Sequence, residues 1–367
     1  MITKDKHHKH PPLIRRILGN YHHSEWAWYG TNCGAITEMV DTVRARLEGH
    51  RIDYIDADHS NDISGTKLQV GKKQFYTDIG GEWNHFDDRL EAIDCDAVFV
   101  NGNHYSATRQ IIIIDEAKEA SLLRRVEQLT DIDMVIVDDE SQIFPFVKEA
   151  MTAQTKVYKV DKLDAIVGHI AEQVKKQIPV VKGLVLAGGK SQRMGKDKSQ
   201  IDYHGKTQEQ YMVQLLESIN IETFLSKAHK VDSPTSQVIT DRFVDMGPFG
   251  AIASAMMDDP NAAWLVVACD MPFVTKEVLQ NLLDQRDASL TATAYRGADN
   301  PFPEPLIAIY EPRAYQRFLS FLSLGYACPR KVLINSEIKE VILDDMQIIA
   351  NVNTKEQLVE AQKKLGK

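Results

Sequence analysis

The sequence predicts an α/β protein of two domains. Short apolar runs alternate with segments whose apolar residues recur at helical spacing, which is typical of sheets covered by helices. At 367 residues the chain is long for one domain and comfortable for two. A helix-like segment at 163–176 is followed by Pro179, which ends a helix readily. We therefore predict one domain at 1–180 and a second at 181–367.

Each predicted element has its own local pattern. In the N-terminal half, aliphatic runs predict strands at 26–29, 52–55, 97–100, 111–114 and 134–137, and helical spacing predicts helices at 36–47 and 163–176. In the C-terminal half the runs predict strands at 184–186, 223–225, 238–240, 264–268 and 290–294. Two further segments, 306–310 after a proline-rich turn at 300–305 and 339–343, are left without an assigned type. Helices are predicted there at 210–219, 251–257, 276–285, 314–324 and from residue 355 onward.

Composition and charge exclude several classes of protein. The net charge of −9 argues against a general nucleic-acid binder, which needs a basic face or stripe. No apolar run is long enough to cross a bilayer, and the polar residues 1–10 lead into no apolar segment of a signal peptide. The four cysteines lack C-x-x-C spacing, which indicates reduced thiols rather than a zinc site or disulfides. We expect a cytoplasmic protein that binds neither membranes nor nucleic acid.

The segment at 183–198, G-L-V-L-A-G-G-K-S-Q-R-M-G-K-D-K, is the most informative part of the chain. Its apolar run breaks into a loop that holds three glycines and several basic residues. Glycines let backbone N–H groups approach a polyanion. Arg193 and Lys198 supply the positive charge that a triphosphate and its departing pyrophosphate need. The alternative is an ordinary strand-to-helix turn with solvated basic residues, but glycines and basic residues alternating directly after a strand favour a nucleotide loop.

This loop is neither of the two common phosphate loops. G-x-x-x-x-G-K-[ST] fails because Asp197 stands where serine or threonine is required, and G-x-G-x-x-G fails because Gly188 and Gly189 are adjacent. The pattern L-A-G-G-x-S-x-R-M-G-x-D-K at 186–198 resembles the opening signature of the nucleotidyltransferases, most closely that of the molybdenum cofactor guanylyltransferases. The resemblance covers roughly residues 181–367 and implies a Rossmann-like, three-layer α/β/α domain.

The same resemblance implies which residues serve the nucleotide. Those expected to contact it are Leu186, Ala187, Gly188, Gly189, Ser191, Arg193, Gly195, Lys198, Asp245 and Gly247. The last two belong to D-M-G-P-F-G at 245–250, which resembles the family's D-x-G-P-L-x-G turn with Phe249 in place of leucine. Gly247 would let the backbone approach the base or the sugar. A glycine turn that caps a helix is the alternative.

Asp270 is the first candidate metal ligand. It follows the apolar run at 264–268, and α/β sheets place ligand-binding groups at such strand ends. A carboxylate that faces a basic loop suits Mg²⁺ bridging phosphate oxygens. A helix N-cap is the alternative, because Pro272 follows at a plausible first helical position. The segment resembles the family's C-D-M-P motif, whose aspartate holds magnesium.

Asn353 is the second candidate metal ligand. The sequence N-V-N-T at 351–354 resembles the family's N-I-N-T-P, in which the second asparagine helps to hold the metal and the phosphates. Lys355 replaces the usual proline, so the match is imperfect. A helix cap formed by Asn353 or Thr354 is the alternative. The resemblance therefore implies Asp270 and Asn353 as metal ligands, and Arg193, Lys198 and Asp270 as catalytic residues.

These residues suit an in-line attack on an α-phosphate. A phosphate monoester is already an anion, so the attack needs positioning and charge neutralisation rather than a Ser-His-Asp machinery. The resemblance supplies the substrates: GMP would pass from GTP to molybdopterin that carries molybdenum, with release of pyrophosphate. A cytidylyl donor, a sugar-phosphate acceptor, or a carrier that binds nucleotide or pterin without turnover are the alternatives. The oligomeric state does not follow from the sequence.

The N-terminal half resembles a phosphate-loop domain that has lost its signature. If Gly34 is the second glycine of G-x-x-x-x-G-K-[ST], Tyr29 replaces the first, Ala35 the lysine and Ile36 the serine or threonine. We therefore expect a P-loop-like α/β domain without an intact Walker A motif and without NTP hydrolysis. Its strand order resembles the GTP-binding adapter that partners the guanylyltransferase. That resemblance implies docking or substrate delivery, with molybdoenzymes or cofactor chaperones as further partners.

Overall fold

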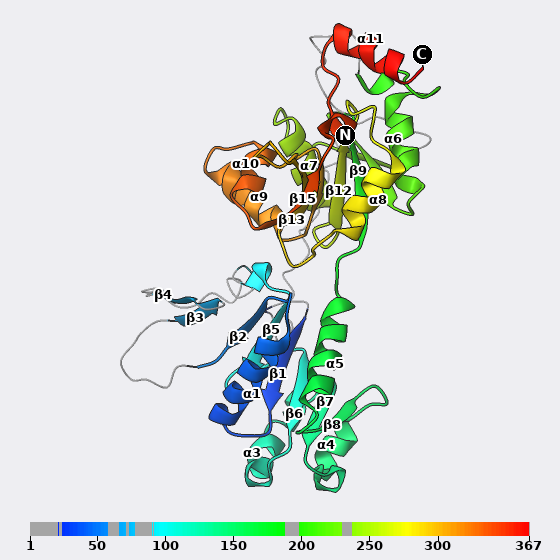
Figure 1. Ribbon diagram of the computed structural model, residues 1–367. Coiled ribbons are helices and arrows are strands. Elements are labelled where there is room, and N and C mark those ends of the chain that lie inside the picture. Colours follow the sequence, from blue (N-terminus) through cyan, green and yellow to red (C-terminus); the bar gives the residue numbers. More distant parts are fainter. Residues whose placement is uncertain are drawn as a thin grey trace, which may run out of the picture. The chain divides into compact units, whose positions relative to one another are not determined.

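The computed structural model describes residues 21, 24–57, 66–70, 73–77, 90, 92–187, 198–229 and 237–366. The chain divides into two compact units, Met1–Gln177 and Ile178–Lys367 (Figure 1). Each unit is a largely parallel sheet with helices on its faces, which confirms the predicted α/β class. Most of the nucleotide loop lies outside the described residues, namely Gly188, Gly189, Ser191, Arg193 and Gly195.

The N-terminal unit contains a wholly parallel six-stranded sheet of order β2-β5-β1-β6-β7-β8. Its strands are β1 Glu25–Tyr29, β2 Ile52–Ile55, β5 Ala97–Asn101, β6 Arg109–Ile113, β7 Ile132–Val137 and β8 Lys156–Lys159. The α-helices are α1 Cys33–Arg46, α3 Glu119–Leu123, α4 Pro145–Ala150 and α5 Leu163–Lys175. A separate antiparallel pair is formed by β3 Thr66–Val70 and β4 Lys73–Thr77.

Both faces of this sheet are buried. Trp26 and Trp28 of β1 belong to a core cluster that includes side chains of α1 and α5. The intervening Ala27 and the following Tyr29 belong to a second cluster, with side chains of α3 and α4. A strand covered on both faces is apolar throughout, which is why its sequence is a continuous run rather than an alternation. The edge strand β8 has no buried residue, so no apolar run predicts it.

The C-terminal unit contains a seven-stranded sheet of order β11-β10-β9-β12-β14-β13-β15. Its strands are β9 Val181–Leu186, β10 Glu222–Lys227, β11 Gln237–Thr240, β12 Ala263–Ala268, β13 Ala292–Gly297, β14 Ile307–Tyr310 and β15 Ile338–Leu343. The α-helices are α6 Gln208–Glu217, α7 Pro248–Asp258, α8 Lys276–Asp284, α9 Ala314–Ser323, α10 Pro329–Ile334 and α11 Lys355–Lys364. Only β14 runs against its neighbours, β12 and β13.

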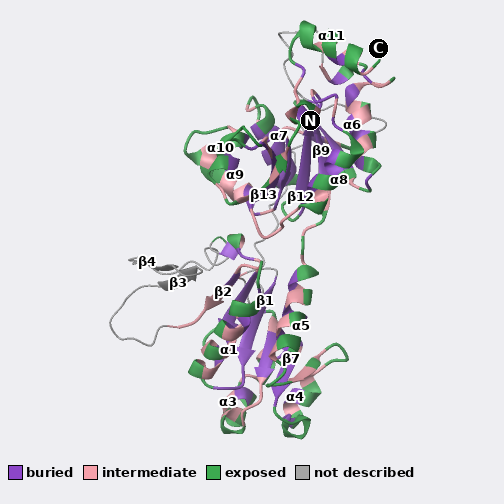
Figure 2. Ribbon diagram, viewed as in Figure 1, coloured by how far each residue is buried: buried purple, intermediate pink, exposed green. Residues whose placement is uncertain are grey.

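Two apolar layers enclose this second sheet. One cluster joins the sheet to α6 and α8, and the other joins it to α7, α9 and α10. The unit is therefore a three-layer α/β/α domain, and Figure 2 shows buried residues concentrated on its central strands. The predicted strand at 290–294 begins two residues later in the structure, at Ala292. The six-residue helix α10 is too short to give a helical period and was not predicted.

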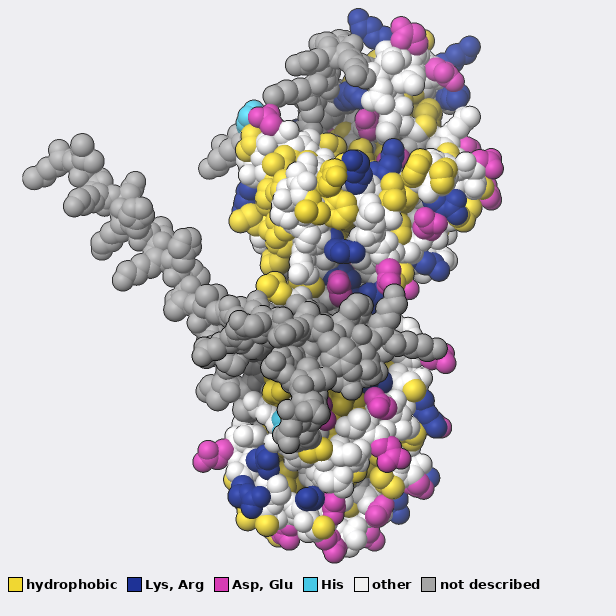
Figure 3. Space-filling model, turned by 90° about the vertical axis from the view of Figure 1, so that its left-hand side faces the viewer, with side chains coloured by type: hydrophobic (Ala, Val, Ile, Leu, Met, Phe, Trp, Pro, Cys, Tyr) yellow, Lys and Arg dark blue, Asp and Glu magenta, His cyan; other side chains and the backbone are white. Residues whose placement is uncertain are grey.

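On the face drawn in Figure 3, basic and acidic side chains are interspersed on the described parts of both units. Within the described residues, none of the helices has the length and hydropathy that crossing a membrane requires.

Candidate functional site

The candidate site lies where adjacent parallel strands of the C-terminal unit end. The backbone N–H of Cys269, just after β12, donates to the carbonyl oxygen of Leu186 at the end of β9, at 3.3 Å. On the other side of β9, the N–H of Ala187 donates to the carbonyl oxygen of Ser226 in β10, also at 3.3 Å. The nucleotide loop therefore leaves the sheet between two strand ends, one of which leads directly to Asp270. Ligands bind at this edge of open α/β sheets.

Three predicted site residues meet at this edge. Lys198 begins the 3₁₀ turn η5 (Lys198–Gln200), and its Nζ lies 3.3 Å from Oδ2 of Asp270. The same Nζ donates to Oδ1 of Asn353 at 2.5 Å. The backbone N–H of Val352 donates to the carbonyl oxygen of Asp270 at 2.7 Å, which ties the C-terminal segment to the strand end. Lys198 and Asp270 are 23% and 21% exposed, so their charged groups face a partly open site.

The helix-cap alternatives for Asp270 and Asn353 are not what the structure shows. Helix α8 begins at Lys276 with Thr275 at its N-cap, so Asp270 caps no helix. Helix α11 is capped by Thr354, whose side chain accepts from the N–H of Gln357 in a capping box. Because Thr354 performs the cap, the side chain of the neighbouring Asn353 is left to contact Lys198.

The oxygen atoms at this site suit a divalent cation. Oδ1 of Asp270 is buried and has no hydrogen-bond partner among the described residues, and the same holds for Oδ1 of Asn351. A buried carboxylate oxygen without a partner is costly unless a ligand satisfies it. Mg²⁺ takes one or two carboxylates and completes its shell with water and substrate phosphates, so one aspartate with nearby asparagine oxygens is a donor set that fits such an ion.

Residues 183–339 match the family described as MobA-like NTP transferase domain. The C-terminal half of the chain carries a MobA-like NTP transferase domain.

The chain is also similar to two curated relatives and to one solved structure. The chain is 37% identical over 178 residues to a molybdenum cofactor biosynthesis bifunctional protein from Synechocystis sp., covering 47% of this chain and 51% of that protein. The chain therefore spans about half the length of that relative. It is 27% identical over 195 residues to a probable molybdenum cofactor guanylyltransferase from Bacillus mycoides, covering 50% of this chain and 96% of the relative. A structure of molybdopterin-guanine dinucleotide biosynthesis protein A from Archaeoglobus fulgidus is similar with a TM-score of 0.44 and 22% identity, covering 50% of this chain and 98% of that one.

The structure brings two further ionisable groups, Glu304 and Tyr203, within electrostatic reach of Asp270. Burial raises the pKa of Glu304 above its usual value, and the negative charge of Asp270 adds to the rise. The Arg330 guanidinium, 3.1 Å from Glu304, acts in the opposite direction. Burial, together with the charge of Asp270, also raises the pKa of Tyr203 to about 12. The available sequence signal for Glu304 was its place between two prolines just before β14.

The turn before α7 is sharply bent. Asp245 has a φ of +61° and Gly247 a φ of +56°, the left-handed region that favours glycine. Gly247 is the N-cap of α7, and Pro248 is the first helical residue, so the glycine turn caps a helix in this MobA-like domain. At Gly250 an added Cβ would lie 2.1 Å from the carbonyl oxygen of Phe243, so no larger residue fits there.

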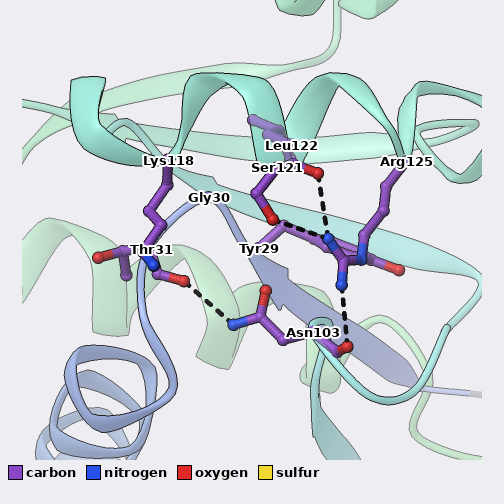
Figure 4. Close-up of a pocket in the computed structure, with 8 residues that line it drawn as sticks. All are labelled: Tyr29, Gly30, Thr31, Asn103, Lys118, Ser121, Leu122 and Arg125. Carbon is purple, nitrogen blue, oxygen red and sulfur yellow. Dashed lines mark hydrogen bonds between the residues drawn. The ribbon is translucent and has the colours of Figure 1, made fainter.

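The N-terminal unit has its own strand-end loop. Only residues 30–32 separate β1 from α1, and the side chain of Asn32 accepts from the N–H of Ala35. One N–H of the first helical turn is therefore occupied within the protein, where a phosphate loop would present it to a ligand. A small pocket beside this loop is lined by Lys118 and Arg125 among others (Figure 4). Arg125 is already engaged there, because it donates to the carbonyl oxygen of Asn103 at 3.1 Å.

Proposed function

We propose that the C-terminal unit transfers GMP from GTP to molybdenum-bearing molybdopterin and releases pyrophosphate. The names of the curated relatives support this reaction. The observation that carries the proposal is the meeting of Lys198, Asp270 and Asn353 at the carboxyl edge of the sheet. These side chains combine one positive charge with oxygen donors that suit a metal, next to a glycine-rich loop. That combination suits phosphoryl transfer.

The chemistry assigned to these residues is charge neutralisation and positioning. An oxygen of the acceptor's phosphate monoester attacks the α-phosphorus of GTP and forms a new P–O bond. The bond from that phosphorus to the bridging oxygen breaks, and pyrophosphate leaves. We assign the ammonium of Lys198 to neutralise the negative charge of the triphosphate and of the departing pyrophosphate. Arg193, in the nucleotide loop, is assigned the same role. Asp270 and Asn353 would hold Mg²⁺, which when bound supplies further positive charge to phosphate oxygens.

We assign the N-terminal unit a non-hydrolytic, adapter-like role in docking or substrate delivery. The support is the absent lysine, since Ala35 stands in its place, and the loop geometry around Asn32. Molybdoenzymes or cofactor chaperones are the partners that such a unit would serve. The four cysteines are all free thiols, which supports a reducing compartment, the cytoplasm.

Measurements of nucleotide binding and pyrophosphate release distinguish a guanylyl from a cytidylyl donor, and an enzyme from a carrier. We expect calorimetry with Mg²⁺ to show selective binding of GTP over CTP, ATP and UTP by the full chain. Lys198→Ala should weaken GTP binding about tenfold or more, because a hydrogen-bonded charge contributes roughly 1.5–3 kcal/mol. Lys206→Ala, on the same unit, is the matched control and should leave affinity unchanged. Selective binding of CTP would move the protein to cytidylyl transfer, and nucleotide binding without pyrophosphate release would make it a carrier.

The fragment 178–367 should retain catalysis and lose only affinity or delivery. It begins at Ile178 because Arg286 donates to the carbonyl oxygen of Pro179, and the N–H of Ala263 donates to that of Val180. Starting later would remove bonds that belong to the catalytic unit. The measurement is pyrophosphate release by the fragment and by the full chain at matched concentrations. A folded fragment without activity would show that the N-terminal unit contributes to the active site.

A further inference from the structure

The N-terminal unit places a cysteine, a histidine and an aspartate together, outside the site proposed above. Cys33 is the first residue of α1, Asp56 follows β2, and His104 lies in the turn after β5. Strands β2, β5 and β1 are consecutive neighbours in the sheet and run parallel, so these three segments reach the same edge. Cys33 and His104 are 71 residues apart in the sequence, and only the strand order brings them into contact.

The contacts within this cluster are direct. Nε2 of His104 lies 3.2 Å from Sγ of Cys33 and 3.8 Å from Oδ1 of Asp56. The His104 and Asp56 side chains are each 23% exposed, and Cys33 is also partly exposed. Cys95 and Cys269 are buried, whereas Cys328 is partly exposed like Cys33.

Several groups surround the sulfur of Cys33. Cys33 stands at the N-terminus of a 14-residue helix, whose end carries a partial positive charge. The side-chain amide of Asn103 donates to Sγ at 3.6 Å. Asp56 places a carboxylate oxygen beside the His104 ring, and donors from Asn101 and Tyr54, at 3.0 and 3.1 Å, hold the Asp56 carboxylate in place.

We propose that Cys33 is a nucleophilic thiol, with His104 as its proton acceptor, that reacts with low-molecular-weight disulfides. His104 takes the proton of Cys33, and the thiolate attacks one sulfur of R–S–S–R. A bond forms between Sγ and that sulfur, the R–S–S–R bond breaks, and R–S⁻ leaves with the electron pair. His104 then returns the proton to give R–SH. The Cys33 sulfur is oxidised, the departing sulfur is reduced, and no further reactant is needed.

A disulfide is the electrophile that needs the fewest further groups at this site. Thiol–disulfide exchange needs only the thiolate and a route to it. Because Cys95 is buried, no second cysteine of the unit is available to displace the adduct. The mixed disulfide therefore persists until an external thiol removes it, which makes Cys33 a site of reversible modification.

The test uses the full chain and oxidised glutathione at pH 7, followed by peptide mass spectrometry at each cysteine. Cys328 is the control, because it stands at the N-cap of a helix and is partly exposed like Cys33, and no histidine contacts it in the part of the chain that the structure describes. Cys33 should be modified at least about tenfold faster than Cys328. Both should react at similar rates in urea, and dithiothreitol should reverse the modification.

Two variants test the role of His104. His104→Gln should bring the rate at Cys33 close to that at Cys328, and Asp56→Asn should slow it several-fold while keeping a similar side-chain shape. Circular dichroism establishes whether each variant is folded. If His104→Gln does not fold, Asp56→Asn still tests the proposal, because it changes the charge and keeps the shape of the side chain. Equal rates at Cys33 and Cys328 in the native chain would overturn the proposal, as would a folded His104→Gln variant that reacts as fast as the native chain.

Discussion

Replacing Asp270 with asparagine is expected to lower kcat for pyrophosphate release by about 10³-fold, the size of effect seen when a group that stabilises a transition state is removed. Asparagine keeps the shape and one oxygen but loses the negative charge. The buried Oδ1 without a partner, which we assign to the metal, therefore no longer attracts a divalent cation. The Mg²⁺ concentration that gives half-maximal rate should rise in parallel. Steady-state kinetics over a magnesium series measures both quantities.

The control for this variant is Asp344→Asn. Asp344 is an exposed acid of the same unit, so the same change there should leave kcat and magnesium dependence unaltered. Circular dichroism separates a loss of chemistry from a loss of folding. A folded Asp270→Asn enzyme with near-native kcat and unchanged magnesium dependence would remove Asp270 from the reaction and with it the proposed metal site.

Replacing Arg286 with alanine is expected to destabilise the C-terminal unit by about 3–5 kcal/mol. Arg286 pairs with Glu311 through two hydrogen bonds of 2.7 Å, and the Glu311 side chain is fully buried. Removing the guanidinium leaves the buried carboxylate without its hydrogen-bonded partner, with the more distant charge of Arg313 still acting on it, and it also removes the bond to Pro179. Urea unfolding of fragment 178–367 measures the loss, because Trp264 is its only tryptophan and is completely buried.

The pH dependence of the unfolding free energy shows whether the charge of Glu311 causes the destabilisation by Arg286→Ala. Burial raises the pKa of Glu311, and Arg286 opposes the rise in the native chain. An acid whose pKa is raised in the folded state contributes stability at low pH and loses it as the pH rises through that pKa. The destabilisation by Arg286→Ala should therefore shrink as the pH is lowered and Glu311 takes up a proton. Arg242→Ala, which breaks a surface pair with Asp258 whose side chains are 49% and 42% exposed, should cost at most about 1 kcal/mol at any pH.

Local patterns in the sequence accounted for most of the elements. Strand β12 differs from its predicted bounds by one residue, because a fully buried strand is a continuous apolar run. Strand β2 has the predicted bounds, although only Ile52 of it is fully buried. The patterns failed where an element has little apolar content, as in β8, or is a single short turn, as in α10. They also left open whether Asn353 or Thr354 caps α11, because either side chain can accept a helix N–H.

The candidate site could be predicted in part from local sequence patterns, and the rest required the tertiary structure. A glycine-rich basic loop after a strand, and an aspartate after another strand, can be recognised locally because the chemistry is carried by neighbouring residues. The contact between Lys198 and Asn353 joins positions 155 residues apart, and no local pattern specifies which of many polar residues will meet. The same is true of Glu304 beside Arg330, and of Cys33 beside His104.

The sequence by itself determined the α/β class, the nucleotide loop and the residue types available for phosphoryl chemistry, because periodicity, glycines and charges act over a few residues. Tertiary structure alone decided which of those residues share a site. Strand order brings β9 beside β12, and the backbone bond from Val352 to Asp270 carries Asn353 to the end of that sheet. In the other unit, the order β2-β5-β1 gathers Asp56, His104 and Cys33. Contacts between residues distant in the sequence depend on how whole helices and strands pack, which is a property of the fold rather than of any short segment.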